Sequence, residues 1–228
     1  MAKLEWDNAG NRFYETGVKN VVLYVYDAKT KQYKNGVAWN GVTSISESPS
    51  GAEPTALYAD DNKYLNLLSA EEFAASIEAY TYPDEFAECD GSVSLTTGVM
   101  IGQQTRSKFA LAYKTTVGND EAGNSLGYKL HIIYNCLAAP SEKSYATIND
   151  SPEAITFSWE ISTTPEEVTG HRPTAIIKVN STKVDQTKYN ALKDILYGKG
   201  EVAPRLPLPD DVKKILEGSR TPDGGVAK

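Results

Sequence analysis

Short runs of β-branched and aromatic residues, each ended by glycine, asparagine or proline, recur through most of this sequence. The first run, Val21–Tyr26, is too short for a typical helix and indicates a strand. Because many short strands separated by turns are typical of sandwiches and barrels, we predict a mainly β fold of the α+β class, built as a β-sandwich or barrel. Later strands are expected at 92–100, 108–117, 128–137, 154–163 and 174–179.

Turn sequences near the N-terminus predict a pair of strands and a loop. The dipeptide Asn-Gly occurs at 35–36 and 40–41, and both residues tolerate the positive φ angles of tight turns. We therefore expect the runs 33–39 and 41–46 to pair as strands. The stretch 46–62 that follows concentrates Ser, Pro and Gly in its first half, which predicts a long exposed loop, and such loops in compact domains are usually functional.

The segment 73–82 fits two structures. Ser69 and Glu72 could form the capping box of a helix, whereas the alternation of side chains along 73–82 fits a strand. We favour the strand, because Pro83 then ends it. Proline and acidic residues in 83–88 suit the N-terminus of a short helix, which would flank the sheet.

One amphipathic helix is expected late in the chain. Asp185 is a suitable N-cap, Gly198 is a suitable stop, and apolar residues between them share one face. A second, short helix is expected at 210–217. The patterns divide the chain into an N-terminal arm (1–19), a β domain (20–198) and a C-terminal extension (199–228).

An excess of acidic residues limits the classes of partner. The 228 residues carry a net charge of -7, and the sequence pI is about 5.0. Binding to nucleic acid requires clustered Lys and Arg that displace counterions from phosphate, so this balance argues against it. The first twenty residues lack the apolar core of a secretory signal, and no stretch approaches the roughly 18 apolar residues of a membrane span. We expect a protein that stays in a cytoplasm.

Residues with catalytic or metal-binding potential are sparse. His131 lies in a strand-like run and His171 in a loop, and Cys89 and Cys136 form no CxxC pair. We expect His131 and Cys136 in the core and His171 in solvent. Adjacent acids occur in several places, but a glycosidase requires two carboxylates that face one cleft, which only a structure can test. The sequence therefore predicts no enzyme, no metal site and no cofactor.

An ordered series of local phrases carries a resemblance to a known family. The phrases are FYETGV at 13–18, YKNGVAWNG at 33–41, YADDNKY at 58–64, YPDEFAECDG at 82–91, GQQTR at 102–106, PSEKSY at 140–145, TINDS at 147–151 and TTP at 163–165. In this order they resemble the major tail proteins, or tail tube proteins, of siphophages that infect Gram-positive bacteria. No single phrase is specific to that family, but their colinearity is.

The resemblance implies a β-sandwich of the tail tube type that assembles into homohexameric rings. Such rings stack along the tail, and strands of all subunits join in an inner barrel, which leaves no sheet edge unpaired. A long loop and terminal arms would bridge one ring to the next. The candidates for these inter-ring contacts are Phe13, Tyr14, Ser48, Pro49, Gly51, Glu53 and Pro54.

The resemblance also implies a virion protein, assembled in the host cytoplasm, that surrounds the genome during ejection. DNA would pass through the lumen without specific binding, because an acidic wall repels phosphate. Glu78 and Glu160 lie on the polar phases of strands and are the lumen candidates, although an outer surface fits them equally well. Further expected partners are the tape measure protein and tail terminator or tail tip proteins, with no membrane.

Other interpretations stay open. A β-sandwich that binds a host receptor or a carbohydrate on the virion would expose an aromatic patch, and the alternating tyrosines could supply one, although packing explains them as well. A head decoration or tail-completion protein would form single rings or trimers. The C-terminal extension could clamp a neighbouring subunit or coat the outside of the tube.

Overall fold

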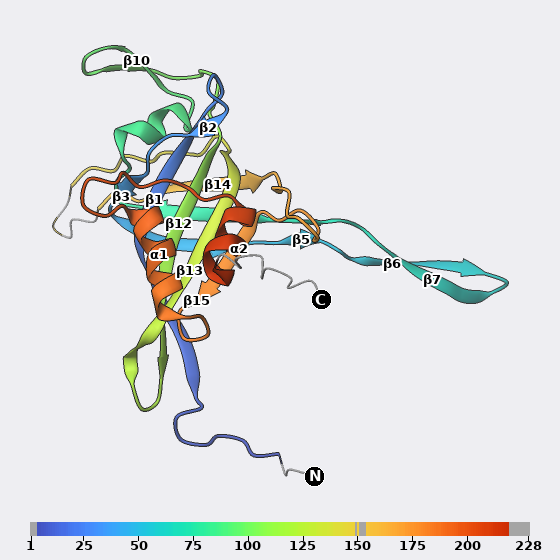
Figure 1. The fold of residues 1–228 in the computed structure, drawn as a ribbon. Coiled ribbons are helices and arrows are strands. Elements are labelled where there is room, and N and C mark those ends of the chain that lie inside the picture. The colour runs from blue at the N-terminus through green and yellow to red at the C-terminus, as the bar shows by residue number, and fades with distance from the viewer. Residues whose placement is uncertain (1–3, 149, 151–153, 219–228) are drawn as a thin grey trace, which may run out of the picture.

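One curled antiparallel sheet forms the body of the protein in the computed structural model, which describes residues 4–148, 150 and 154–218 (Figure 1). Its strands are β1 (Phe13–Asp27), β2 (Gln32–Tyr33), β3 (Val37–Trp39), β4 (Val42–Glu47), β9 (Ala74–Ala79), β12 (Phe109–Asn119), β13 (Gly123–Ala138), β14 (Phe157–Thr163) and β15 (Ile176–Asn180). They follow the order β2-β1-β12-β13-β14-β9-β4, with β3 on β1 and β15 on β13. The predicted mainly β class is confirmed.

The sheet is curled, because β3 and β4 are consecutive in the chain but hydrogen-bond to strands near opposite ends of the sheet. Only Asn40 and Gly41 separate the two strands, yet β3 pairs with β1 and β4 pairs with β9. Gly41 has a φ of +79°, a conformation that favours glycine, and this bend carries the chain from one layer to the other. The prediction that 33–39 and 41–46 pair with each other is wrong for this reason. The result is a barrel-like sandwich.

Aromatic side chains fill the inside of the curled sheet. Trp39, Phe86, Phe109 and Trp159 are all buried there. Their rings meet largely edge to face: the centroids of Phe86 and Phe109 lie 5.4 Å apart with planes at 86°, a favourable arrangement for aromatic pairs. Phe86 belongs to η1 (Asp84–Glu88), a 3₁₀ helix, so the short helix expected after Pro83 is confirmed.

Two helices cover the outer face of β1, β12 and β13. In α1 (Gln186–Tyr197), the Asp185 side chain accepts hydrogen bonds from two backbone N–H groups of the first turn, which confirms the predicted cap. Leu192 of α1 and Val212 of α2 (Pro209–Glu217) are buried on the sheet. Neither of these helices is long and apolar enough to cross a membrane, and the described residues contain no other α-helix.

The segment predicted as a long loop, 46–62, belongs to a β-hairpin. Its strands are β5 (Ser50–Gly51), β6 (Pro54–Ala59), β7 (Asn62–Leu68) and β8 (Glu71–Glu72), with β5 paired to β8 and β6 to β7. We call residues 48–73 the arm, which extends far from the body (Figure 1). The loop prediction was wrong because the Pro and Gly residues typical of loops occur here beside a strand. That strand, β6, forms by hydrogen bonding to β7, most of which lies beyond residue 62.

Two further segments differ from the prediction. The expected strand at 92–100 is a hairpin of β10 (Val93–Thr96) and β11 (Val99–Ile101), because Gly98 turns the chain with a φ of +78°. Residues 13–19, assigned to the N-terminal arm, pair with β12. The C-terminal extension packs on the body through Leu206 and Val212, and residues 219–228 lie outside the described part. The strand predicted within 73–82 is confirmed as β9.

The buried contact of α1 with the sheet yields a stability prediction. Leu192→Ala removes a side chain with 0% exposure, and we expect the free energy of unfolding to fall by about 2–5 kcal/mol, because the deletion leaves a cavity. Urea denaturation followed by circular dichroism measures this. Asn190→Ala, on the exposed side of the same helix, should change stability by less than about 0.5 kcal/mol. Equal effects of the two variants would contradict the packing described.

Candidate assembly surfaces

One surface of the curled sheet is built from serine and glutamate. Strands β4, β9 and β14 alternate inward apolar residues, such as Ile77 and Trp159, with outward polar ones. The Ser44 hydroxyl donates to the Glu78 carboxylate at 3.0 Å, which shows that neighbouring strands contribute to one surface. The three strands contain no Lys or Arg. We call this surface the serine-glutamate face, and it consists of Ser44, Ser46, Ser76, Glu78, Ser158, Glu160 and Ser162.

Both glutamates predicted for the lumen lie on the serine-glutamate face. Glu78 is in register with Ser158, and Glu160 is in register with Ser76, so the two carboxylates stand on adjacent strands. Both side chains are exposed. The sequence placed each glutamate on a polar phase but could not place them together, because residues 80–156 separate β9 from β14. Serine at every second position was the available signal for a polar surface.

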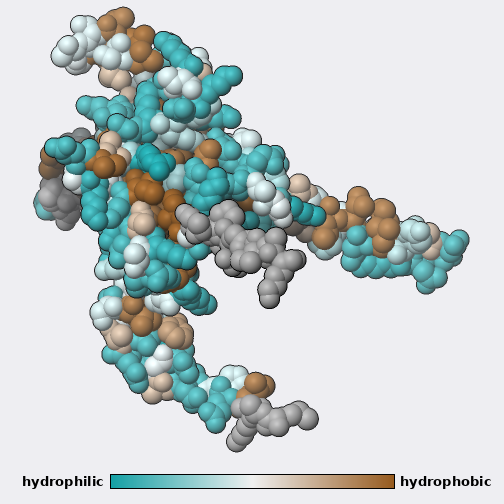
Figure 2. All heavy atoms as spheres, viewed as in Figure 1, coloured by the Kyte–Doolittle hydropathy of each residue, from teal (hydrophilic) through white to brown (hydrophobic). Residues whose placement is uncertain are grey.

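The arm exposes apolar side chains that nothing in the described chain covers. Leu57 and Leu65 face each other across β6 and β7, and Leu67 lies beside them with 59% of its surface exposed. Figure 2 shows apolar residues gathered along the part of the arm nearer the body, with a hydrophilic end. Exposed apolar patches on projections commonly mark contacts with another protein. The arm therefore has the character of an unpartnered interface.

Five of the seven predicted inter-ring residues lie on the outgoing side of the arm, in and around β5 and at the start of β6. Ser48, Pro49, Gly51, Glu53 and Pro54 are all exposed there. Gly51 is required by the backbone, because it has a φ of +80° and a Cβ at that position would approach the Ala70 carbonyl oxygen to 2.2 Å. The two strands thus meet closely at the root of the arm, which sets its direction.

Phe13 and Tyr14 lie apart from the arm. They begin β1 and run beside the β12–β13 hairpin, where the Tyr14 hydroxyl donates to Asn124 Oδ1 at 2.9 Å. Phe13 is 62% exposed. In the described chain this half of β1 pairs with β12 alone, so its other edge is open. The structure therefore separates these two candidates from the other five.

A charged cluster that the sequence did not reveal lies where β4 leads into the arm. His131 is 4% exposed, with its Nε2 3.3 Å from Glu15 Oε1 and its Nδ1 3.3 Å from Glu47 Oε1. Its ring stacks on Tyr113 with centroids 4.6 Å apart. Glu15 belongs to β1 and Glu47 is the last residue before the arm. The cluster therefore ties the first strand to the root of the arm.

Two lysines complete the cluster and balance its charge. Lys129 binds Glu15, and Lys178 Nζ lies 2.5 Å from Glu47 Oε2. Burial lowers the pKa of His131, although Glu47 and Glu15 oppose this. Burial alone would raise the carboxyl pKa values, but the lysines hold the pKa of Glu15 and of Glu47 below the usual range. The neutral histidine thus sits between two ion pairs. The expected core position of His131 is confirmed, as is that of Cys136.

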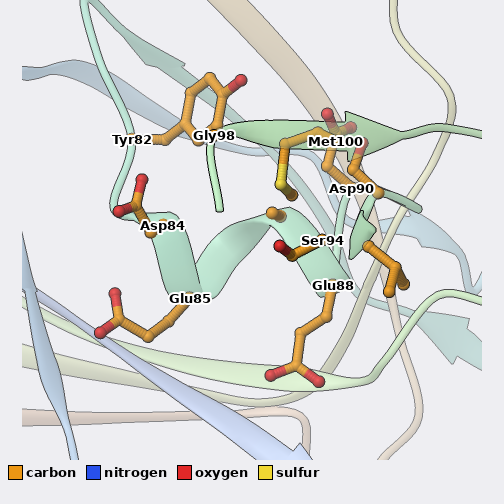
Figure 3. A pocket seen from close by; sticks show the side chains of 11 residues that line it. Tyr82, Asp84, Glu85, Glu88, Asp90, Ser94, Gly98 and Met100 are labelled. Atoms are coloured by element: carbon orange, nitrogen blue, oxygen red, sulfur yellow. The ribbon is translucent and has the colours of Figure 1, made fainter. Parts of the chain in front are cut away.

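A groove of about 660 Å³ between η1 and the β10–β11 hairpin is lined by several acidic residues (Figure 3). Its carboxylates do not converge: Asp84 and Glu85 are exposed, and Glu88 lies 2.6 Å from Lys34 Nζ. The Asp90 side chain, 7% exposed, is bound by Lys143 at 2.5 Å and by Arg106. Among the residues that line this groove, no free pair of buried carboxylates suits glycoside hydrolysis.

The two cysteines are buried, and the described residues contain no arrangement that would hold a metal ion. Burial raises the pKa of the Cys89 thiol to about 12, which leaves almost no nucleophilic thiolate at neutral pH. Burial also raises the pKa of Cys136. No group of three His, Cys, Asp or Glu side chains within the described part of the chain is placed to hold a metal ion. His171 is exposed, as predicted.

The burial of neutral His131 predicts a pH dependence of stability. The unfolded chain takes up a proton near the ordinary pKa of 6.5, whereas the folded chain resists it, so stability falls as pH drops below 6.5. One proton contributes at most about 1.4 kcal/mol per pH unit. Urea unfolding between about pH 7.5 and about pH 5.5 should show a smaller loss for His131→Gln than for the parent protein. His171→Gln removes the chain's other histidine and should leave the dependence of the free energy of unfolding on pH as in the parent protein. The same pH dependence in all three proteins would contradict the role given to His131.

Comparison with known proteins adds little to this geometry. No protein family model matches the sequence, and no curated protein matches it. One solved structure that aligns is described as the baseplate of the anti-feeding prophage, determined by cryo-electron microscopy with six-fold symmetry. The alignment covers 79% of this chain and 100% of that chain at 9% identity, with a TM-score of 0.37. A likeness of this degree establishes neither a shared fold nor a shared function.

Proposed function

We propose that this protein is a structural virion subunit whose homohexameric rings stack into the tail tube of a long-tailed bacteriophage. The serine-glutamate face carries the proposal, together with the family resemblance of the sequence. The face is a sheet surface with hydroxyls, two carboxylates and no basic group on β4, β9 or β14. It would line the lumen of each ring.

The chemistry of this face suits DNA that must slide. Phosphate binds where Lys and Arg displace its counterions, and a surface without Lys and Arg lacks this source of affinity for DNA. Glu78 and Glu160 add negative charge that repels the backbone. Serine hydroxyls keep the surface hydrated without creating a strong anion site. A conduit needs these properties, whereas a DNA-binding protein needs the opposite ones.

The arm supports stacking of rings because it grows from the same strands. β4 enters the arm and β9 leaves it, so a lumen wall made of these strands would project one apolar arm per subunit. The exposed leucines of the arm would be buried on a subunit of the next ring. Within a ring, the open edge of β1 and the free edges of β4 and β15 offer places for neighbouring strands.

A receptor-binding or carbohydrate-binding module fits the structure less well. Carbohydrate sites commonly present aromatic rings, and the serine-glutamate face has none. Exposed tyrosines occur at the arm, on Tyr58 and Tyr64, but on a thin projection rather than a concave surface. The proposal includes no catalytic activity and no cofactor. Its partners are further copies of this chain, the tape measure protein, and tail terminator or tail tip proteins, with assembly in the host cytoplasm.

Removal of the arm tests ring stacking. Both sides of the arm must be removed together, because deletion of 48–54 alone would remove β5, the partner of β8, and would leave most of the β6–β7 hairpin in place. Replacing residues 52–70 by Asn-Gly joins Gly51 to Glu71, which already face each other. We expect a folded protein that forms no tubes in negative-stain electron microscopy, whereas the parent protein forms long ones.

A milder variant tests the apolar contacts of the arm separately from its presence. Leu57→Ser with Leu65→Ser keeps the hairpin but removes apolar contact area, so it should shorten the tubes or raise the protein concentration they require. An unchanged urea midpoint of the body would show that folding is intact. Normal tubes from the truncated protein would exclude a bridging role for the arm.

Charge reversal on the serine-glutamate face tests the lumen. Glu78→Lys with Glu160→Lys should leave tube assembly intact and slow or block genome ejection, because lysines would hold phosphate. Phage particles that carry the variant can be scored for DNA release and infectivity. Glu167→Lys with Glu201→Lys makes the same change in net charge at other exposed sites and should eject normally. Normal ejection by the first variant would place the face outside the lumen.

A further inference from the structure

Three lysines gather on the helix-covered side of the sheet. Lys19 of β1 and Lys114 of β12 stand directly opposite each other in the strand register, and Lys193 of α1 lies close enough to lower the pKa of Lys114. The Lys114 ammonium is 4.4 Å from the centroid of the Tyr197 ring and 5.8 Å from that of Tyr128. We call these three residues the lysine cluster.

The lysine cluster has no acidic partner. No described carboxylate lies within salt-bridge distance of Lys19, Lys114 or Lys193, whereas Lys129 of β13 is paired with Glu15 and Lys178 of β15 with Glu47. Like charges that face each other across two strands destabilise a sheet. Burial and the two other lysines lower the pKa of Lys114. In a protein of net charge -7, such a concentration of unpaired positive charge points to an anionic partner.

A groove adjoins the lysine cluster. It has a volume of about 260 Å³ and runs along 18–22 of β1 and 38–42 between β3 and β4, with Lys19 and Tyr197 at its border. A groove of this size accepts a few side chains of a narrow projection, not the flat surface of another domain. The occupant should therefore be a slender, acidic element.

The tip of the arm has these properties. Asp60 and Asp61 form the turn between β6 and β7 with φ of 50° and 61°, which places two adjacent acidic residues at the end of the arm. Neither has an ion-pair partner among the described residues, and both are exposed. Tyr58 and Tyr64 flank them, with 71% and 73% of their surfaces exposed, and could cover the lysine stems. The strand from 48 to 60 spans on the order of 40 Å at about 3.3 Å per residue, a reach suited to another subunit.

We propose that the tip of the arm, residues 58–64, docks on the lysine cluster and its groove in a second copy of this chain. This inference rests on the proposed ring stacking and specifies the surface that receives the arm. Opposite charges would set the register between subunits, while the arm's leucines supply apolar contact. The contact is heterologous, since two different surfaces meet, and it can therefore repeat along a tube.

Neutralisation of the tip tests the charge pairing. Asp60→Asn with Asp61→Asn keeps side chains that tolerate positive φ and should raise the protein concentration needed for tubes by roughly tenfold. Glu71→Gln with Glu72→Gln removes two adjacent carboxylates at the root of the same arm and should have little effect. Lys19→Gln with Lys193→Gln should reproduce the tip effect. Raised salt should weaken the parent tubes more than those of the tip variant, because it screens exposed charges.

Cross-linking locates the contact directly. Lys63→Cys at the tip and Asn190→Cys on α1, one turn before Lys193, keep Asp60, Asp61 and the lysine cluster in place. A short bis-maleimide should link such subunits into a ladder on denaturing gels, and the native Cys89 and Cys136 are buried and should not react. Glu72→Cys with Asn190→Cys serves as the matched pair and should give no ladder.

The outcomes separate this inference from the proposed function. Tubes without a tip-specific ladder, or equal ladders from both cysteine pairs, would overturn the docking site while leaving the tube role intact. Failure of the parent protein to form tubes would instead overturn the proposed function. Binding of duplex DNA by the parent but not by Lys19→Gln with Lys193→Gln, with normal tubes from that variant, would make the cluster a nucleic-acid site and overturn the docking.

Discussion

The two-residue alternation of β9 and β14 is the constraint on which the rest of this structure depends. Ala75, Ile77 and Ala79 enter the aromatic core from β9, and Trp159 and Ile161 enter it from β14. Once these side chains are buried, the residues between them must face outward. A shift of one residue in either strand would bury glutamate and expose tryptophan, so core packing fixes the register of the serine-glutamate face. Surface chemistry is thus a consequence of interior packing.

The His131 cluster extends the same coupling to the arm. Glu47 ends β4 and is held by Lys178 and His131, while Glu15 of β1 is held by Lys129. The chain enters the arm directly after Glu47, so its starting direction is set by ion pairs around the buried His131 rather than by a flexible hinge. Gly51 then brings the two arm strands together. A long projection gains a defined direction from these two features.

The sequence predicted those elements whose signals are local. Asp185 as a cap, the short helix after Pro83 and the strands near 108–117 and 128–137 follow from neighbouring residues, and each is present. The arm was misjudged because its pairing partner lies beyond the segment that looked like a loop. The His131 cluster joins β1, β4, β12, β13 and β15, and no spacing along the chain brings those strands together. In the sequence, the alternate polar residues Lys129 and His131 in an otherwise apolar strand were the one signal for this cluster.

The distribution of charge explains how one chain could assemble in a directed way. A net charge of -7 would repel identical subunits if it were spread evenly. Here carboxylates stand on the serine-glutamate face and at the arm tip, whereas Lys19, Lys114 and Lys193 are unpaired on the side that the helices cover. Opposite surfaces of unlike sign favour head-to-tail contacts over symmetric pairs, because the symmetric contact would place like charges together. Apolar area on the arm would supply affinity, and the placement of charge would decide which surfaces meet.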